Sequence, residues 1–136
     1  REYPGWLFSV CQGATTTWEH WDGMREDGSF WSTDMNSFNH YAYGAVIDWV
    51  YEKAAGISHA ESAPGFTRLH FEPKPCKELS WLDTTLETRH GLIHSRWEYT
   101  DGALQIDLET PVPADILLPS GHRTVEPGTY HFTEKD

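Results

Sequence analysis

The chain has 136 residues, enough for one modest domain, and it begins at Arg1 without an initiator methionine, so we expect the C-terminal piece of a larger protein. Its 21 acidic and 10 basic side chains give a formal net charge of −11, which argues against nucleic acid as a partner because phosphates would be repelled. No apolar run reaches the roughly 18 residues needed to cross a bilayer, so we predict no membrane partner. The cellular compartment is left open.

Cysteine and histidine usage argues against a disulfide framework and against a metal site. Cys11 and Cys76 are far apart and form no CxxC motif, so we expect two buried free thiols. His20, His40 and His59 lack the spacing and the acidic neighbours of a metal site. The sequence therefore predicts neither a metal nor a cofactor.

The first segment, from Gly5 to Thr33, is rich in glycine and aromatic residues. Asp22-Gly23 and Asp27-Gly28 are turn signals, and Gln12 to Trp18 is a candidate short helix. A long irregular segment of this kind more often forms a lid or a binding wall than a scaffold.

A helix is predicted from Ser37 to Ala55. Asn36 or Ser37 would cap its first amides, and Gly56 would end it. Apolar residues occur on most of its faces, which is typical of a helix packed on most sides.

The pattern changes around residues 58 to 65, whose composition is that of a loop, and we predict a domain of residues 1–60 followed by one of residues 61–136. Downstream, Leu104, Ile106 and Leu108 alternate with polar residues, which indicates an antiparallel β-sandwich. Asp101-Gly102 predicts a tight hairpin, and Pro127-Gly128 predicts a second tight turn. The predicted strands cover residues 66–72, 80–88, 91–100, 103–109, 114–119 and 129–132.

The run Trp18-Glu19-His20-Trp21 has the composition of a sugar site. Sugar rings present C–H faces that stack on indoles, and their hydroxyls need carboxylate or imidazole partners. Shielding by the two tryptophans would desolvate the Glu19 carboxyl, which suits proton transfer. The alternatives are that the tryptophans fill a core, that Glu19 pairs with Arg25 or lies on the surface, and that His40 bonds to backbone at a helix start.

Several longer runs of this sequence resemble a known family of enzymes. Residues 12–23 (QGATTTWEHWDG), residues 35–41 (MNSFNHY) with Gly44, residues 55–57 (AGI) and residues 64–66 (PGF) resemble the end of the catalytic domain of family 78 glycoside hydrolases, the α-L-rhamnosidases. The similarity extends over about residues 1 to 75. The remainder resembles, more loosely, the C-terminal β-sandwich of those enzymes.

This resemblance implies an α+β fragment, in which the last helices of an (α/α)6 six-hairpin barrel precede an antiparallel β-sandwich. It implies an inverting α-L-rhamnosidase that removes terminal, non-reducing α-L-rhamnose and works with two carboxyl groups. Glu19 matches the general base, His40 matches a histidine that contacts rhamnose, and Trp18 or Trp21 would wall the sugar. No residue matches the general acid, so we expect the isolated chain to be inactive and to pack on the rest of the barrel in the parent.

Two other functions remain open at this stage. A carbohydrate-binding β-sandwich module would use Glu19 only as a hydrogen-bond acceptor, so its sugar binding would not depend on proton transfer. Another six-hairpin glycosidase would differ in the residues that face the substrate upstream of this chain.

Overall fold

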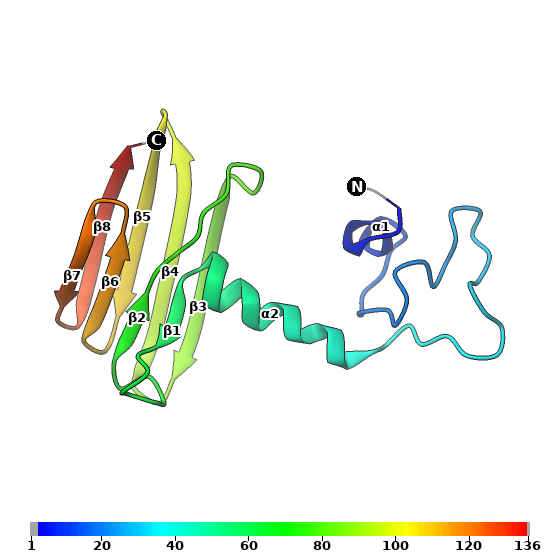
Figure 1. Cartoon of the computed structure of the whole chain (residues 1–136), viewed down its shortest axis with the longest axis horizontal. Helices are drawn as coiled ribbons and strands as arrows, with labels where there is room; N and C mark the ends of the chain where they lie inside the picture. Colours follow the sequence, from blue (N-terminus) through cyan, green and yellow to red (C-terminus); the bar gives the residue numbers. More distant parts are fainter. Residues whose placement is uncertain (1–2, 136) are drawn as a thin grey trace. The chain divides into compact units, whose positions relative to one another are not determined.

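The computed structural model describes residues 3–135 (Figure 1). By their contacts, the residues form two compact units, Arg1–Ile47 and Asp48–Asp136, and each is described by itself. The domain boundary after residue 60 stays a prediction. Strand β1 (Ile57–His59), upstream of that position, is paired within a sheet of the second unit.

The first unit is mostly irregular. Helix α1 (Trp6–Cys11) opens it, and residues 12–40 are turns and loops with one isolated bridge between Met24 and Phe30. The helix expected from Gln12 to Trp18 is wrong, because α1 ends at Cys11 and Gly13 has a φ of 86°. A positive φ of this size does not continue a right-handed helix.

Helical backbone returns later than the sequence predicts. Instead of starting at Ser37, it starts with the 3-10 helix η1 (Tyr41–Ala45) and continues as α2 (Val46–Trp49) and the π-helix η2 (Val50–Ala54). His40 precedes η1 and gives no side-chain cap, so the predicted caps Asn36 and Ser37 are wrong. Tyr41 and Trp49 are 89% and 59% exposed, so the expected burial on most faces is not found within the chain itself.

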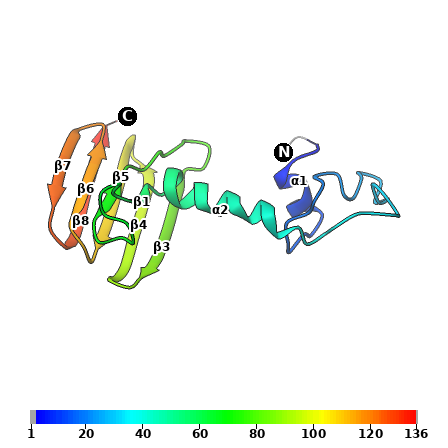
Figure 2. The ribbon, with the colours of Figure 1, turned by 60° about the horizontal axis from the view of Figure 1, so that its bottom comes forward.

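The second unit is a β-sandwich of two four-stranded sheets, shown face to face in Figures 1 and 2. One sheet has the order β1-β2-β6-β7 and the other β3-β4-β5-β8. All strand pairs are antiparallel except β2 with β6. The α+β class with a sandwich is therefore confirmed. The remaining strands are β2 (Leu69–Phe71), β3 (Trp81–Thr88), β4 (Gly91–Thr100), β5 (Ala103–Thr110), β6 (Ala114–Leu118), β7 (Gly121–Val125) and β8 (Gly128–Lys135).

The core lies between the sheets and also secures the end of η2. Trp97 is 1% exposed, and its Nε1–H donates to the carbonyl oxygen of Ala54 at 2.8 Å. The buried hydroxyl of Ser95 donates to the carbonyl oxygen of Ala55 at 2.8 Å. Because the last carbonyls of a helix have no partner within it, these side chains complete its hydrogen bonding. Gly56, with a φ of 76°, then ends the helix as predicted.

Candidate active site

The predicted site residues lie on two segments of the first unit that are joined by hydrogen bonds. Glu19 N–H donates to the Ser37 carbonyl oxygen at 2.8 Å, and His40 N–H donates to the Thr17 carbonyl oxygen at 2.7 Å. The Thr17 hydroxyl donates in the opposite direction, to the carbonyl oxygen of His40 at 2.8 Å. We call this set, together with the 2.5 Å bond from the Thr16 hydroxyl to the Phe38 carbonyl oxygen, the site ladder.

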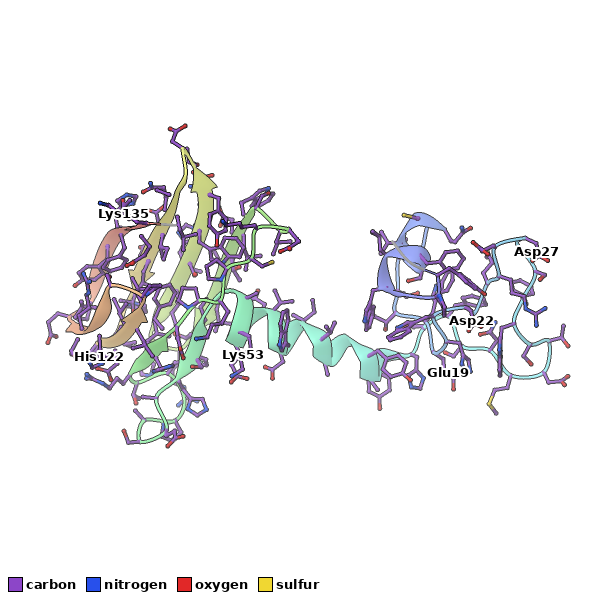
Figure 3. All side chains as sticks on the ribbon, turned by 45° about the horizontal axis from the view of Figure 1, so that its top comes forward. Glu19, Asp22, Asp27, Lys53, His122 and Lys135 are labelled. Atoms are coloured by element: carbon purple, nitrogen blue, oxygen red, sulfur yellow. The ribbon has the colours of Figure 1, made fainter. Side chains whose placement is uncertain are left out.

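The ladder also fixes the carboxylate of Glu19. Its Oε2 accepts a hydrogen bond from the Ser37 N–H at 3.3 Å, so the two residues are joined in both directions. The Glu19 side chain, labelled in Figure 3, is half-buried. Oε1 accepts no hydrogen bond from residues 3–135, so that oxygen can accept a proton or a hydrogen bond from a hydroxyl.

The alternative of an ion pair between Glu19 and Arg25 is not found among the described residues. The Arg25 guanidinium instead donates to the carbonyl oxygen of Trp31 at 3.3 Å. Glu19 is therefore held by backbone rather than by a cation.

The two predicted wall tryptophans have different surroundings. Trp18 is only 6% exposed and packs edge-on against Phe38, with ring centroids 5.0 Å apart. Trp21 is 47% exposed, and its ring centroid lies 6.2 Å from that of Trp6. Trp21 thus offers aromatic surface that a ligand can stack on, whereas Trp18 is buried.

His40 and His20 both lie against aromatic rings. The His40 ring is 4.9 Å from Tyr43, and the His20 ring stacks on Trp31 at 4.1 Å. The ladder holds the backbone of His40 on both its N–H and its carbonyl oxygen, and its side chain is half-buried. His40 stands at the helix start, as the alternative expects, but its side chain makes no capping hydrogen bond there.

Gly23 and Asn36 join the two ends of the loop that links the ladder segments. The sequence did not single them out as site residues. The Asn36 amide donates to the Gly23 carbonyl oxygen at 2.8 Å, and Trp31 N–H donates to the same oxygen at 3.0 Å. A Cβ at Gly23 would lie 3.2 Å from Asn36 Oδ1, so the loop is packed for glycine. Thr17 and Ser37 were also missed, because their roles depend on contacts across about 20 residues that no local pattern predicts.

Residues 3–135 contain no cluster of three or more His, Cys, Asp or Glu that could hold a metal ion. Cys11 and Cys76 are both free and exposed, so the expectation of buried thiols is wrong. In the part of the chain that the structure describes, no helix has the length and apolar character to traverse a bilayer.

Comparison with known proteins gives consistent results along the chain. The chain is 36% identical over 124 residues to an α-L-rhamnosidase of Streptomyces avermitilis, and 37% identical over 120 residues to one of Formosa agariphila. These alignments cover 90% and 87% of this chain but only 12% and 13% of those proteins. The chain therefore spans about an eighth of the length of these relatives.

Solved structures agree in fold. The crystal structure of the Streptomyces avermitilis α-L-rhamnosidase complexed with L-rhamnose matches 99% of this chain and 15% of that one, at a TM-score of 0.86 and 30% identity. The native Aspergillus terreus α-L-rhamnosidase matches 98% of this chain and 16% of that one, at a TM-score of 0.89 and 34% identity.

Family models divide the chain in two. Residues 1–54 match the bacterial α-L-rhamnosidase six-hairpin glycosidase domain, and residues 56–131 match the bacterial α-L-rhamnosidase C-terminal domain. The chain thus belongs to the bacterial α-L-rhamnosidase family, as a fragment that joins the end of the six-hairpin domain to the C-terminal β-sandwich.

Proposed function

We propose that this chain forms the C-terminal part of an inverting α-L-rhamnosidase, in which Glu19 is the general base. The observation that carries the proposal is the site ladder, which holds Glu19 and His40 on neighbouring segments and orients the Glu19 carboxylate through the Ser37 N–H. Support for the substrate comes from the relatives, which are named α-L-rhamnosidases, and from one that was solved with L-rhamnose.

In this mechanism Glu19 removes a proton from a water molecule, which attacks the anomeric carbon on the face opposite the leaving oxygen. Because Ser37 holds Oε2, the unpartnered Oε1 is the oxygen that takes the proton. A second carboxyl group must protonate the leaving oxygen, about 6.5–9.5 Å from the base in inverting enzymes. No residue of this chain matches that acid, so we assign it to another part of the parent.

The aromatic residues would bind the sugar in this proposal. His40 contacts rhamnose with its imidazole, and Trp21 presents an exposed indole to the C–H face of the ring. Trp18, the other predicted wall residue, is buried against Phe38 and would support the wall from beneath. The exposed apolar residues of η1 and α2 would pack on the remaining helices of the barrel.

The test replaces Glu19 by Gln in the full-length parent and follows the hydrolysis of an aryl α-L-rhamnoside, with calorimetry of rhamnose binding in parallel. We expect turnover to fall by about 10²–10⁴-fold while rhamnose still binds. Glu26→Gln is the matched control, because Glu26 lies exposed on the same loop segment. Unchanged turnover in Glu19→Gln would overturn the assignment.

The same experiment separates the sugar-binding alternative, because a binding module would keep its affinity and show no dependence on Glu19 as a base. The isolated chain contains the base without the acid, and we expect it to have no measurable rhamnosidase activity. Turnover by the purified chain would contradict this division of the two carboxyl groups.

A further inference from the structure

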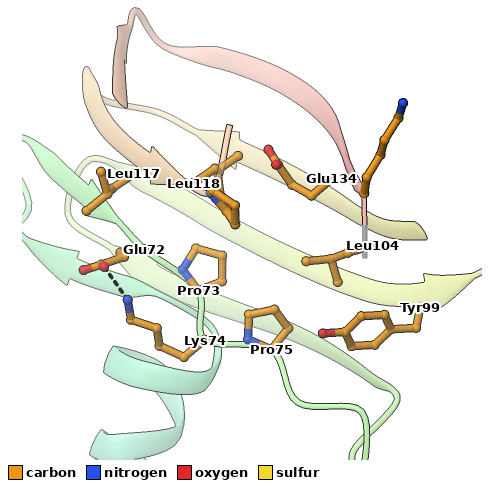
Figure 4. A pocket seen from close by; sticks show the side chains of 11 residues that line it. Glu72, Pro73, Lys74, Pro75, Tyr99, Leu104, Leu117, Leu118 and Glu134 are labelled. Atoms are coloured by element: carbon orange, nitrogen blue, oxygen red, sulfur yellow. Dashed lines mark hydrogen bonds and ion pairs between the residues drawn. The ribbon is translucent and has the colours of Figure 1, made fainter. Parts of the chain in front are cut away.

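The β-sandwich contains a hollow that plays no part in the proposed mechanism. It has a volume of about 560 Å³ and lies at one end of the sandwich, where β4, β5, β6 and β8 meet the segment that follows β2 (Figure 4). Pockets of about 300–1,000 Å³ with apolar walls and a few converging polar groups are typical of small-molecule sites. Its walls are formed by Pro73, Pro75, Tyr99, Leu104, Leu118 and Pro119.

Glu134 is the unusual member of this lining. It lies on β8, it is only 6% exposed, and Oε1 accepts a hydrogen bond from the Ser120 hydroxyl. Ser120 in turn accepts a bond from the Arg123 guanidinium at 3.1 Å. No cation pairs directly with Glu134 in the ion pairs of the described residues. The hollow is where the second carboxylate oxygen of Glu134 can accept a hydrogen bond from a ligand.

The remaining charges of the lining are balanced. Lys74 pairs with Glu72, shown by the dashed line in Figure 4, and hydrogen bonds from Lys74 and His70 lower the pKa of Glu72. The other two charged residues of the lining are Lys135, which is exposed at the rim, and Glu134 inside. A lining with balanced charge favours a neutral ligand over an anion or a cation.

These groups have complementary roles toward one class of ligand. The carboxylate of Glu134 accepts hydrogen bonds, and a hydroxyl group of a neutral ligand can donate one to it. The ring of Tyr99 offers flat apolar surface to C–H groups, and the prolines add to the apolar wall. We infer that this hollow binds a monosaccharide with an apolar face, such as a 6-deoxyhexose, and that it is a second sugar site separate from Glu19.

The test uses L-rhamnose as the probe and the isotope-labelled chain, observed residue by residue by NMR. We expect amide shifts at Leu104, Leu117 and Lys135, with a Kd of about 1 mM or weaker, as suits a shallow site. Glu134→Gln keeps an oxygen that can accept from Ser120 but removes the charge, and it should weaken binding about tenfold.

The matched control is Asp101→Asn, the same change from acid to amide on the exposed hairpin, which should leave binding unaltered. The inference is overturned if rhamnose shifts none of the lining amides, or if Glu134→Gln binds rhamnose as the unmodified chain does. Shifts confined to the amides of Glu19 and Ser37 would likewise refute the second site, yet they would leave the proposed function standing.

Discussion

Gly56 connects η2 to the sandwich, and replacing it tests how closely the backbone packs at this connection. Its φ is 76°, and a Cβ added there would lie 2.2 Å from the nitrogen of Pro73 and 2.5 Å from the carbonyl carbon of Glu72. Both are backbone atoms, which cannot rotate away as a side chain can. Gly65 is the matched control, because its φ is 74° and a Cβ there would meet nothing within 4 Å.

The magnitudes follow from this difference. A left-handed backbone costs an L-residue about 1–2 kcal/mol, partly offset by the lower entropy of the unfolded chain, so Gly65→Ala should cost about 1 kcal/mol. Gly56→Ala adds a displacement of about 1 Å to reach ordinary carbon contact distances. That shift would break the 3.0 Å bond from Glu72 N–H to the Gly56 carbonyl oxygen. We expect a total cost of about 3–5 kcal/mol, most of the stability of a small domain.

The assay is urea unfolding, followed through the indole N–H resonance of Trp97, which reports its bond to the Ala54 carbonyl oxygen. With an m-value of about 1–2 kcal/mol per molar, the midpoint should fall by about 1.5 M or more for Gly56→Ala and by about 0.5–1 M for Gly65→Ala. Equal losses in the two variants would refute the steric argument and leave the shared positive φ as the whole effect.

Three further outcomes are expected. Hydrogen bonds from Arg68 and Thr124 hold the pKa of Asp115 well below its usual range, so its stabilisation is present above the unfolded value of about 4 and is lost as the pH falls toward the folded one. Asp115→Asn should therefore destabilise the sandwich in urea titrations at pH near neutral, with a difference that narrows in acid; a constant difference would contradict this. Thr17→Val in the parent should raise the KM for an aryl rhamnoside more than it lowers kcat, because it removes one of the two bonds that hold the backbone of His40, the residue proposed to contact rhamnose; Thr17→Ser should restore the KM. Trp97→Phe should cost about 1–3 kcal/mol by urea unfolding, because it leaves a buried carbonyl at the end of η2 without its donor.

Periodicity predicted the sandwich strands whose two faces differ in environment. The alternation of Leu104, Ile106 and Leu108 with polar residues matches their burial in β5, and Asp101-Gly102 forms the hairpin with φ values of 54° and 75°. Strands β1 and β7 were missed. Each lies at an edge of its sheet, β1 has three residues, and four of the five residues of β7 are exposed, so neither carries an alternating pattern.

The start of the helical segment shows where local signals are overridden. Asn36 and Ser37 precede an apolar run, as good caps do, yet both are used elsewhere. The carbonyl oxygen and N–H of Ser37 bond to Glu19, and the Asn36 amide bonds to Gly23. These bonds connect segments far apart in the sequence. The last residue bonded in this way is His40, whose N–H donates to the Thr17 carbonyl oxygen, and the helical backbone begins directly after it.

The candidate site was only partly predictable for the same reason. Composition singled out Glu19, His40 and the tryptophans, but it gave no means to tell the buried Trp18 from the exposed Trp21. The atoms of Ser37 that hold Glu19 belong to the main chain, so nearly any residue at that position would provide them. The part of the site that main-chain atoms position therefore leaves no signature in the sequence. The path of the backbone, set by the loop from Gly23 to Asn36, therefore decides where the carboxylate lies.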